Sequence, residues 1–164
     1  MIDFWTPGLI ARAAPGARIL ILLRDPIDRF RSGLTHTDDA TVDTLSHRDA
    51  AGAFQRGLYA QQLRRVFDAL PREQVLIQLY EACREDPAGE LARTFAFLGL
   101  RPVELSPSTF AREVNPTTGR KVELTPGLRN ALQDGYTVDL EALRTLAPEL
   151  DLGHWPTAKA ARLA

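Results

Sequence analysis

The sequence is poor in the residues that define several large classes of protein. It has one cysteine, Cys83, so no disulfide can form within the chain, and a reducing compartment is the simpler expectation. Lys121 and Lys159 are the only lysines, and the formal net charge of -1 argues against a general nucleic-acid-binding protein. No apolar run approaches the ~20 residues that a membrane-spanning helix requires. We therefore expect a cytoplasmic protein with no membrane segment.

The chain does have the composition of a globular protein. Its 164 residues are 45% hydrophobic and 25% charged, which gives enough apolar material for one core. We predict a single domain over residues 1–164.

Two short apolar runs predict strands. The run Ile19–Leu23 is continuous rather than alternating, which is typical of a parallel strand with both faces covered. The second run, Gln74–Tyr80, is apolar at four of its seven positions. Two strands are too few to cover both faces and both edges of a run such as Ile19–Leu23. We therefore expect the sheet to be incomplete in this chain, or covered by a partner or another copy.

Helices are predicted between and after these runs. Apolar residues at helical spacing predict one helix from Phe54 to Pro71 and a separate last helix around residues 140–146, and Gly99 is typical of a helix end. A capping side chain followed by proline marks three helix starts, at Asp25-Pro26, Asp86-Pro87 and Thr125-Pro126. Strands that alternate with helices indicate an α/β fold, with a parallel sheet and flanking helix layers.

The residues after the first strand suggest an anion site. Arg24 stands at the carboxyl end of the strand, where open parallel sheets bind ligands, and its planar guanidinium suits phosphate. Ser32 lies about 120–160° around the next helix from that helix's apolar stripe, so its hydroxyl can face the same crevice. Two other interpretations remain open: Arg24 could pair with a neighbouring carboxylate, and Ser32 could be solvated.

The stretch "LLRDPIDRFRSG" resembles the segment of the sulfotransferase family that binds the 3′-phosphate of 3′-phosphoadenosine 5′-phosphosulfate. That segment has a hydrophobic strand, Arg, Asn or Asp, Pro, an acid-Arg pair, and Ser eight residues after the first Arg. The residues here that fill these places are Arg24, Asp25, Pro26, Asp28, Arg29 and Ser32. The resemblance implies that Arg24 and Ser32 bind the nucleotide, and that the fold is a three-layer, P-loop-like α/β fold.

The resemblance extends from about Ala17 to Trp155. The family's next unit has a helix, a strand that ends in Tyr-Glu, an Asp-Pro and a helix that ends in Phe-Leu-Gly. The residues that fit this order are Tyr80-Glu81, Asp86-Pro87 and 97–99. Cys83 differs from the family pattern, which usually has a leucine at this place. The stretch "NPTTGRK" is similar to a basic loop that closes over the nucleotide. It implies that Gly119 allows close approach and that Arg120 or Lys121 reaches the 3′-phosphate, and a solvated loop without a ligand is the alternative interpretation.

Family members begin with a further strand and a phosphate-binding loop whose lysine stabilises the leaving oxygen, and the general base usually lies in that part. The residues before Ile19 contain no such loop and no lysine. We therefore expect the domain to be truncated at its N-terminal side, through a truncated reading frame, a wrong start or a true loss. We assign no catalytic residue, His36 included, and the family needs no metal ion.

The resemblance implies sulfuryl transfer from 3′-phosphoadenosine 5′-phosphosulfate to a hydroxyl or amine of a small-molecule or carbohydrate acceptor, with adenosine 3′,5′-bisphosphate as product. One alternative is a non-catalytic module that binds a 3′-phosphorylated adenine nucleotide or a protein partner. A more distant alternative is a relative of the nucleoside or nucleotide kinases, which share the layered fold.

Overall fold

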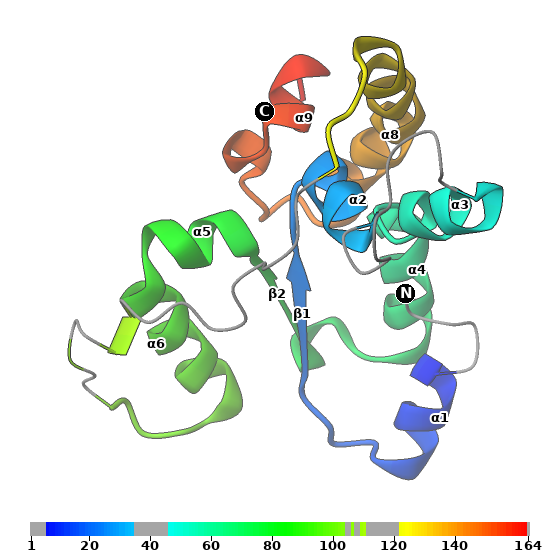
Figure 1. The fold of residues 1–164 in the computed structure, drawn as a ribbon. Coiled ribbons are helices and arrows are strands. Elements are labelled where there is room, and N and C mark those ends of the chain that lie inside the picture. The colour runs from blue at the N-terminus through cyan, green and yellow to red at the C-terminus, as the bar shows by residue number, and fades with distance from the viewer. Residues whose placement is uncertain (1–5, 35–45, 104–105, 107–108, 111–121, 164) are drawn as a thin grey trace.

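Two parallel strands lie at the centre of the structure, which is a computed structural model that describes residues 6–34, 46–103, 106, 109–110 and 122–163. β1 (Ile19–Leu23) pairs with β2 (Val75–Leu79) in a register that runs from Ile19 opposite Val75 to Leu23 opposite Leu79 (Figure 1). Both strands therefore end at the same edge of the sheet. The same register places the next residues, Arg24 and Asp25, beside Tyr80 and Glu81.

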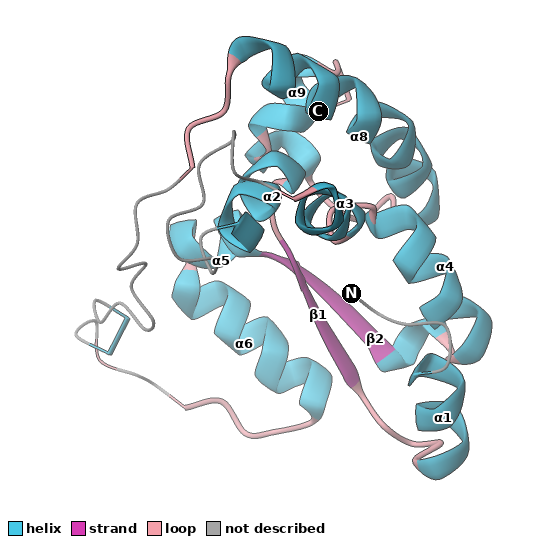
Figure 2. Cartoon of the chain, turned by 45° about the vertical axis from the view of Figure 1, so that its right-hand side comes forward, coloured by secondary structure: helices cyan, strands magenta, loops and turns pink. Residues whose placement is uncertain are grey.

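Helices lie on both sides of the strands, with α6 on one side and α1 and α4 on the other (Figures 1 and 2). This arrangement confirms the predicted α/β fold with a parallel sheet and flanking helices. Among the described residues, no helix combines the length and apolar character needed to cross a membrane. The helices and short 3-10 turns are α1 (Thr6–Ala13), α2 (Pro26–Leu34), α3 (His47–Gln55), α4 (Tyr59–Ala69), η2 (Arg72–Gln74), α5 (Tyr80–Glu85), α6 (Pro87–Leu98), α8 (Pro126–Leu146), η3 (Leu152–His154) and α9 (Pro156–Ala160).

The two faces of β1 differ in exposure. Leu23 is buried and Ile19 and Ile21 pack against the core, but Leu20 and Leu22 are 44% and 59% exposed. Among the described residues, one face of this run is therefore partly uncovered, as expected for a sheet of two strands that is incomplete in this chain. The physical reason is that α6 covers this face only on β2, where the Gln78 amide donates to the Glu90 carbonyl at 3.0 Å.

The core lies on the other face of the sheet, between the strands and the helices α2, α4 and α8. Trp155 and Tyr136 are completely buried there, and each large side chain removed from water stabilises the fold by roughly 1.5–3 kcal/mol. The remaining fully buried large side chains are Leu34, Leu63, Leu140, Leu143 and Pro26. The C-terminal residues around Trp155 are thus part of the core.

The predicted helix starts are confirmed at all three capping residues. Asp25 Oδ1 accepts from the Ile27 and Asp28 N–H groups at the start of α2. Equivalent caps stand at the starts of α6 and α8. The Gly89 N–H donates to the Asp86 carboxylate, and the Leu128 N–H donates to the Thr125 hydroxyl. Gly99 ends α6 in the left-handed region, at φ 69°.

Two predicted helix boundaries are wrong. The helix expected from Phe54 is two helices, because Phe54 belongs to α3 and α4 begins only at Tyr59. Residues 140–146 form no separate helix, because α8 continues through them to Leu146. No proline or glycine pair interrupts that stretch, so the helical hydrogen bonds run on.

Asp139 on α8 caps a different helix. Its carboxylate oxygens accept from the N–H groups of Ala60 and Gln61 at 2.9 and 3.3 Å, in the first turn of α4. The residue that precedes α4, Leu58, offers no side-chain cap of its own. Burial raises the pKa of the Asp139 carboxyl, against the lowering effect of these N–H groups.

We predict that Asp139 makes stability depend on pH in one window. Because its pKa is higher in the folded than in the unfolded chain, the folded chain holds more protons between the two values, and stability falls as pH rises through that window. Asp139→Asn removes this slope, which urea unfolding from pH 3.5 upward measures. Asp134→Asn, on the exposed side of the same helix, controls for the loss of one charge. A slope that persists in Asp139→Asn contradicts the assignment.

Candidate functional site

The turn after β1 is organised around the buried carboxylate of Asp25. Its Oδ1 accepts from Ile27 N–H at 3.0 Å, from Asp28 N–H at 3.2 Å and from the Thr157 hydroxyl at 2.8 Å. Its Oδ2 accepts from Thr157 N–H at 2.9 Å. Four donors compensate for the removal of this carboxylate from water, which would otherwise cost several kcal/mol.

Glu81 makes the matching connection at the end of β2. Its Oε1 accepts from the Asp25 N–H at 3.0 Å, and its Oε2 accepts from the indole N–H of Trp155 at 2.8 Å. The two strand ends are thus joined to each other and to the C-terminal segment. Both oxygens of Glu81 have protein donors, so this carboxylate is a structural link.

The backbone of Arg24 is also held in place. The Tyr59 hydroxyl donates to the Arg24 carbonyl at 2.7 Å, and the Tyr59 ring lies 5.7 Å from the Trp155 ring, centroid to centroid. Burial raises the pKa of Tyr59, so its hydroxyl keeps its proton and remains a donor throughout the physiological pH range. Arg24 therefore projects from a rigid turn.

Among the described residues, a ring contact and an ion pair fix the direction of the Arg24 side chain. Its guanidinium lies over the Tyr80 ring, 4.9 Å from the centroid, and its Nη2 is 3.6 Å from Asp28 Oδ2. Within the described ranges, its buried Nε has no hydrogen-bond partner. An unpaired buried donor costs roughly 1–3 kcal/mol, which an oxyanion ligand can recover.

The N-terminal N–H groups of α2 are not available to that ligand. Asp25 accepts from two of them, and its carbonyl accepts from the Arg29 N–H at 2.7 Å. An anion at this edge must therefore be held by side chains and not by the helix terminus.

A second arginine lies beside Arg24. Arg31 Nη1 is 3.6 Å from Asp28 Oδ1, and its Nε donates to the Val122 carbonyl at 3.1 Å. Val122 directly follows Lys121 in the sequence, and it is buried. Arg31 therefore anchors the chain that follows the predicted "NPTTGRK" loop onto α2, the helix that also carries Ser32.

The predicted nucleotide-binding residues have different outcomes in the structure. Arg24 is at the carboxyl edge of the sheet, as expected, although it faces the Asp28 carboxylate. Ser32 is half-buried in the last turn of α2, and it shares a helix face with Asp28, four residues earlier. The other three predicted residues lie outside the described part of the chain: Gly119, Arg120 and Lys121. The assignment of all five to nucleotide binding stays a prediction.

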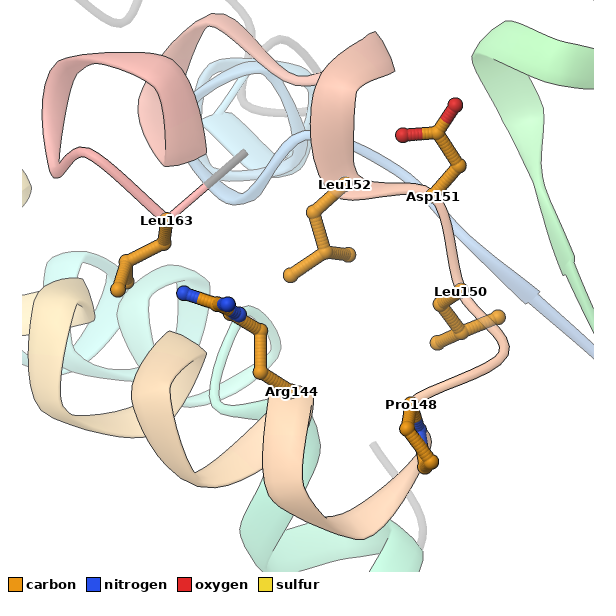
Figure 3. Close-up of a pocket in the computed structure, with 6 residues that line it drawn as sticks. All are labelled: Arg144, Pro148, Leu150, Asp151, Leu152 and Leu163. Atoms are coloured by element: carbon orange, nitrogen blue, oxygen red, sulfur yellow. The ribbon is translucent and has the colours of Figure 1, made fainter.

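A cavity of about 280 Å³ lies elsewhere, at the C-terminal end of α8 (Figure 3). Its lining includes no residue of the Arg24 turn. The lining residues are Arg144, Pro148, Leu150, Asp151, Leu152 and Leu163. We assign it no role in the site.

Sequence reasoning missed the C-terminal contribution to the Arg24 turn. Thr157 and Trp155 contact Asp25 and Glu81 from 132 and 74 residues away. The proline that follows Trp155 was the available signal, because it predicts the start of the short helix α9. No local pattern indicates which carboxylates those residues meet.

Comparison with known proteins gives consistent matches. Residues 9–116 match the family described as "Sulfotransferase domain". Over 110 residues, the chain is 32% identical to human heparan sulfate glucosamine 3-O-sulfotransferase 3B1, an alignment that covers 59% of this chain and 28% of the human protein. The human 3-O-sulfotransferase 6 is 30% identical over 109 residues, with 59% and 32% covered.

A solved structure is also similar. The sulfotransferase from Alicyclobacillus acidocaldarius superimposes with a TM-score of 0.71 at 29% identity, covering 94% of this chain and 63% of that chain. This chain therefore spans less than two thirds of the length of the proteins to which we compare it.

We predict that the Tyr59 hydroxyl stabilises the Arg24 turn measurably. Tyr59→Phe leaves the Arg24 carbonyl without its donor and should lower the free energy of unfolding by about 1–3 kcal/mol in urea titrations. Tyr80→Phe removes a hydroxyl from the ring that contacts the same arginine. It should change stability by less than about 0.5 kcal/mol. Equal effects of the two variants would contradict a specific role for the Tyr59 hydrogen bond.

Proposed function

This chain belongs to the sulfotransferase family, and from that premise we propose that its Arg24 turn binds the 3′-phosphate of 3′-phosphoadenosine 5′-phosphosulfate. The observation that carries the proposal is the Arg24 guanidinium, which is fixed over Tyr80 at the carboxyl edge of the sheet while its buried Nε has no partner among the described residues. A guanidinium keeps its charge at any physiological pH and can donate two parallel hydrogen bonds to a phosphate.

Neighbouring residues complete the proposed site. Asp28 is half-exposed, and its contact with Arg24 at 3.6 Å is long for a charge-assisted hydrogen bond. A phosphate dianion can replace it at little cost, because exposed ion pairs contribute about 0–1 kcal/mol. We propose that Ser32, Gly119 and Arg120 or Lys121 supply the remaining contacts, and the anchoring of Val122 on α2 supports this grouping.

The reaction that follows is sulfuryl transfer. An acceptor oxygen attacks the sulfur, a new S–O bond forms, and the bond from sulfur to the bridging oxygen of the phosphosulfate breaks. The acceptor proton passes to a base, and adenosine 3′,5′-bisphosphate leaves with the bridging-bond electrons. Binding energy at the 3′-phosphate, distant from sulfur, would position the donor for in-line attack.

The acceptor that we propose is a carbohydrate hydroxyl. The human relatives are named for transfer to the 3-O position of glucosamine in heparan sulfate, and this supports a sugar over other acceptors. The cytoplasmic location and a partner at the exposed part of the sheet stay predictions.

A second candidate function is a nucleotide-binding module without catalysis. It is favoured by the two carboxylates that hold the Arg24 turn, Asp25 and Glu81, because all their oxygens accept from protein donors and neither is placed to act as the base that transfer requires. An assay for transfer of labelled sulfuryl to a heparan-type acceptor separates the two functions, because the module would bind the donor and transfer nothing.

We predict that adenosine 3′,5′-bisphosphate stabilises the chain against heat. At a concentration one hundred times its Kd, the melting temperature should rise by about 5–10 °C, as calorimetry or fluorescence would measure. Arg24→Ala should abolish this rise, because it removes the only charge that the proposal places directly on the phosphate from a described residue.

Arg72→Ala is the matched control. Arg72 lies over the Phe67 ring at the same 4.9 Å, and it pairs with Glu149, so its removal also deletes a stacked guanidinium. In this control, adenosine 3′,5′-bisphosphate should still raise the melting temperature. A full rise in Arg24→Ala would exclude Arg24 from the site.

A further inference from the structure

We propose that the C-terminal segment Trp155–Thr157 is a positioning element that sets how tightly the Arg24 turn holds a 3′-phosphate. This inference rests on the proposed nucleotide site and adds to it residues beyond the family match, which ends at residue 116. Neither Trp155 nor Thr157 is a catalytic residue, because each acts through a carboxylate that in turn holds the turn.

Thr157 holds Asp25 with two donors. Its hydroxyl and its backbone N–H donate to different oxygens of the Asp25 carboxylate, at 2.8 and 2.9 Å. Two bonds to both oxygens fix the rotation of the carboxylate as well as its position. That orientation is the one in which Oδ1 also caps α2 through Ile27 and Asp28.

Trp155 acts on the same turn from the other strand. Its indole N–H donates to Glu81 Oε2, while Glu81 Oε1 accepts from the Asp25 backbone N–H. The Trp155 ring lies beside that of Tyr59, whose hydroxyl donates to the Arg24 carbonyl. The segment therefore reaches the Arg24–Asp25 backbone by two routes besides the Thr157 contacts.

These contacts are buried, so water does not replace them easily. Trp155 is fully buried and Asp25 and Thr157 are 3% exposed. Hydrogen bonds to a charged group in such surroundings are stronger than bonds on the surface, and linked bonds support one another. Loss of one donor should therefore change the direction of the Arg24 guanidinium without unfolding the chain.

Thr157→Val tests the inference most directly, because valine keeps the shape and the backbone donor and removes only the hydroxyl. We expect its affinity for adenosine 3′,5′-bisphosphate to fall about tenfold. Its affinity for adenosine 5′-phosphate, which lacks the 3′-phosphate, should stay unchanged in calorimetric titrations. Thr157→Ser retains the hydroxyl and should restore the affinity.

Thr137→Val is the matched control, since the Thr137 hydroxyl donates to the Gln133 carbonyl within α8 at 2.8 Å and contacts neither carboxylate. Trp155→Phe removes the donor to Glu81 and replaces the indole with a smaller aromatic ring, so it provides a second variant with the same expected selectivity and an added loss of stability from the smaller side chain. Equal loss of both nucleotides in Thr157→Val would indicate general loosening and would overturn the inference, as would unchanged affinity for both.

Amide hydrogen exchange separates this inference from the proposed function. Thr157→Val should speed exchange at the amides of Asp25, Ile27 and Asp28 by about tenfold, and Thr137→Val should not. If the unaltered chain binds neither nucleotide, the proposed function fails. Faster exchange then still supports the segment as the element that holds the turn, whereas unchanged exchange overturns the inference.

Discussion

The buried carboxylate of Asp25 connects three parts of the chain that are far apart in sequence. The carboxylate caps α2 and accepts hydrogen bonds from the hydroxyl and the N–H of Thr157. The backbone N–H of Asp25 donates to Glu81 at the end of β2. Because an uncompensated buried carboxylate is costly, the donors to Asp25 support one another. The parallel register of β1 and β2 makes the arrangement possible, since it brings Asp25 and Glu81 to the same edge.

The position of Arg24 follows from this arrangement. The Tyr59 hydroxyl donates to the Arg24 carbonyl, and Glu81 accepts from the N–H of the following residue, Asp25. The Arg24 side chain lies over the Tyr80 ring. The first N–H groups of α2 donate to Asp25, so the positive charge at this edge of the sheet comes from guanidinium groups. A preorganised arginine loses little conformational freedom when a ligand binds. The smaller entropy cost increases the affinity for the ligand. The fold thus orients the residue that the family motif places there.

Local signals in the sequence were sufficient for much of this structure. The continuous run Ile19–Leu23 and the caps at Asp25, Asp86 and Thr125 were found because their physical causes lie within a few residues. The small number of strands indicates that part of this run is uncovered, but periodicity cannot say that the uncovered residues are Leu20 and Leu22, because it does not show how far a covering helix extends. The pairing of Thr157 with Asp25 was missed for a related reason, since only the folded chain decides which distant donor meets a carboxylate. The motif indicated Arg24 itself, but not what fixes its direction.

A phosphorus-31 NMR titration of adenosine 3′,5′-bisphosphate with this chain tests directly whether Arg24 binds the 3′-phosphate. The ligand has two phosphates with separate resonances, so the spectrum reports which one meets the arginine. We expect the 3′-phosphate resonance to shift and broaden most, because that group would replace the weak Asp28 contact of Arg24. A shift confined to the 5′-phosphate, or no change in either resonance at saturating protein, would contradict it.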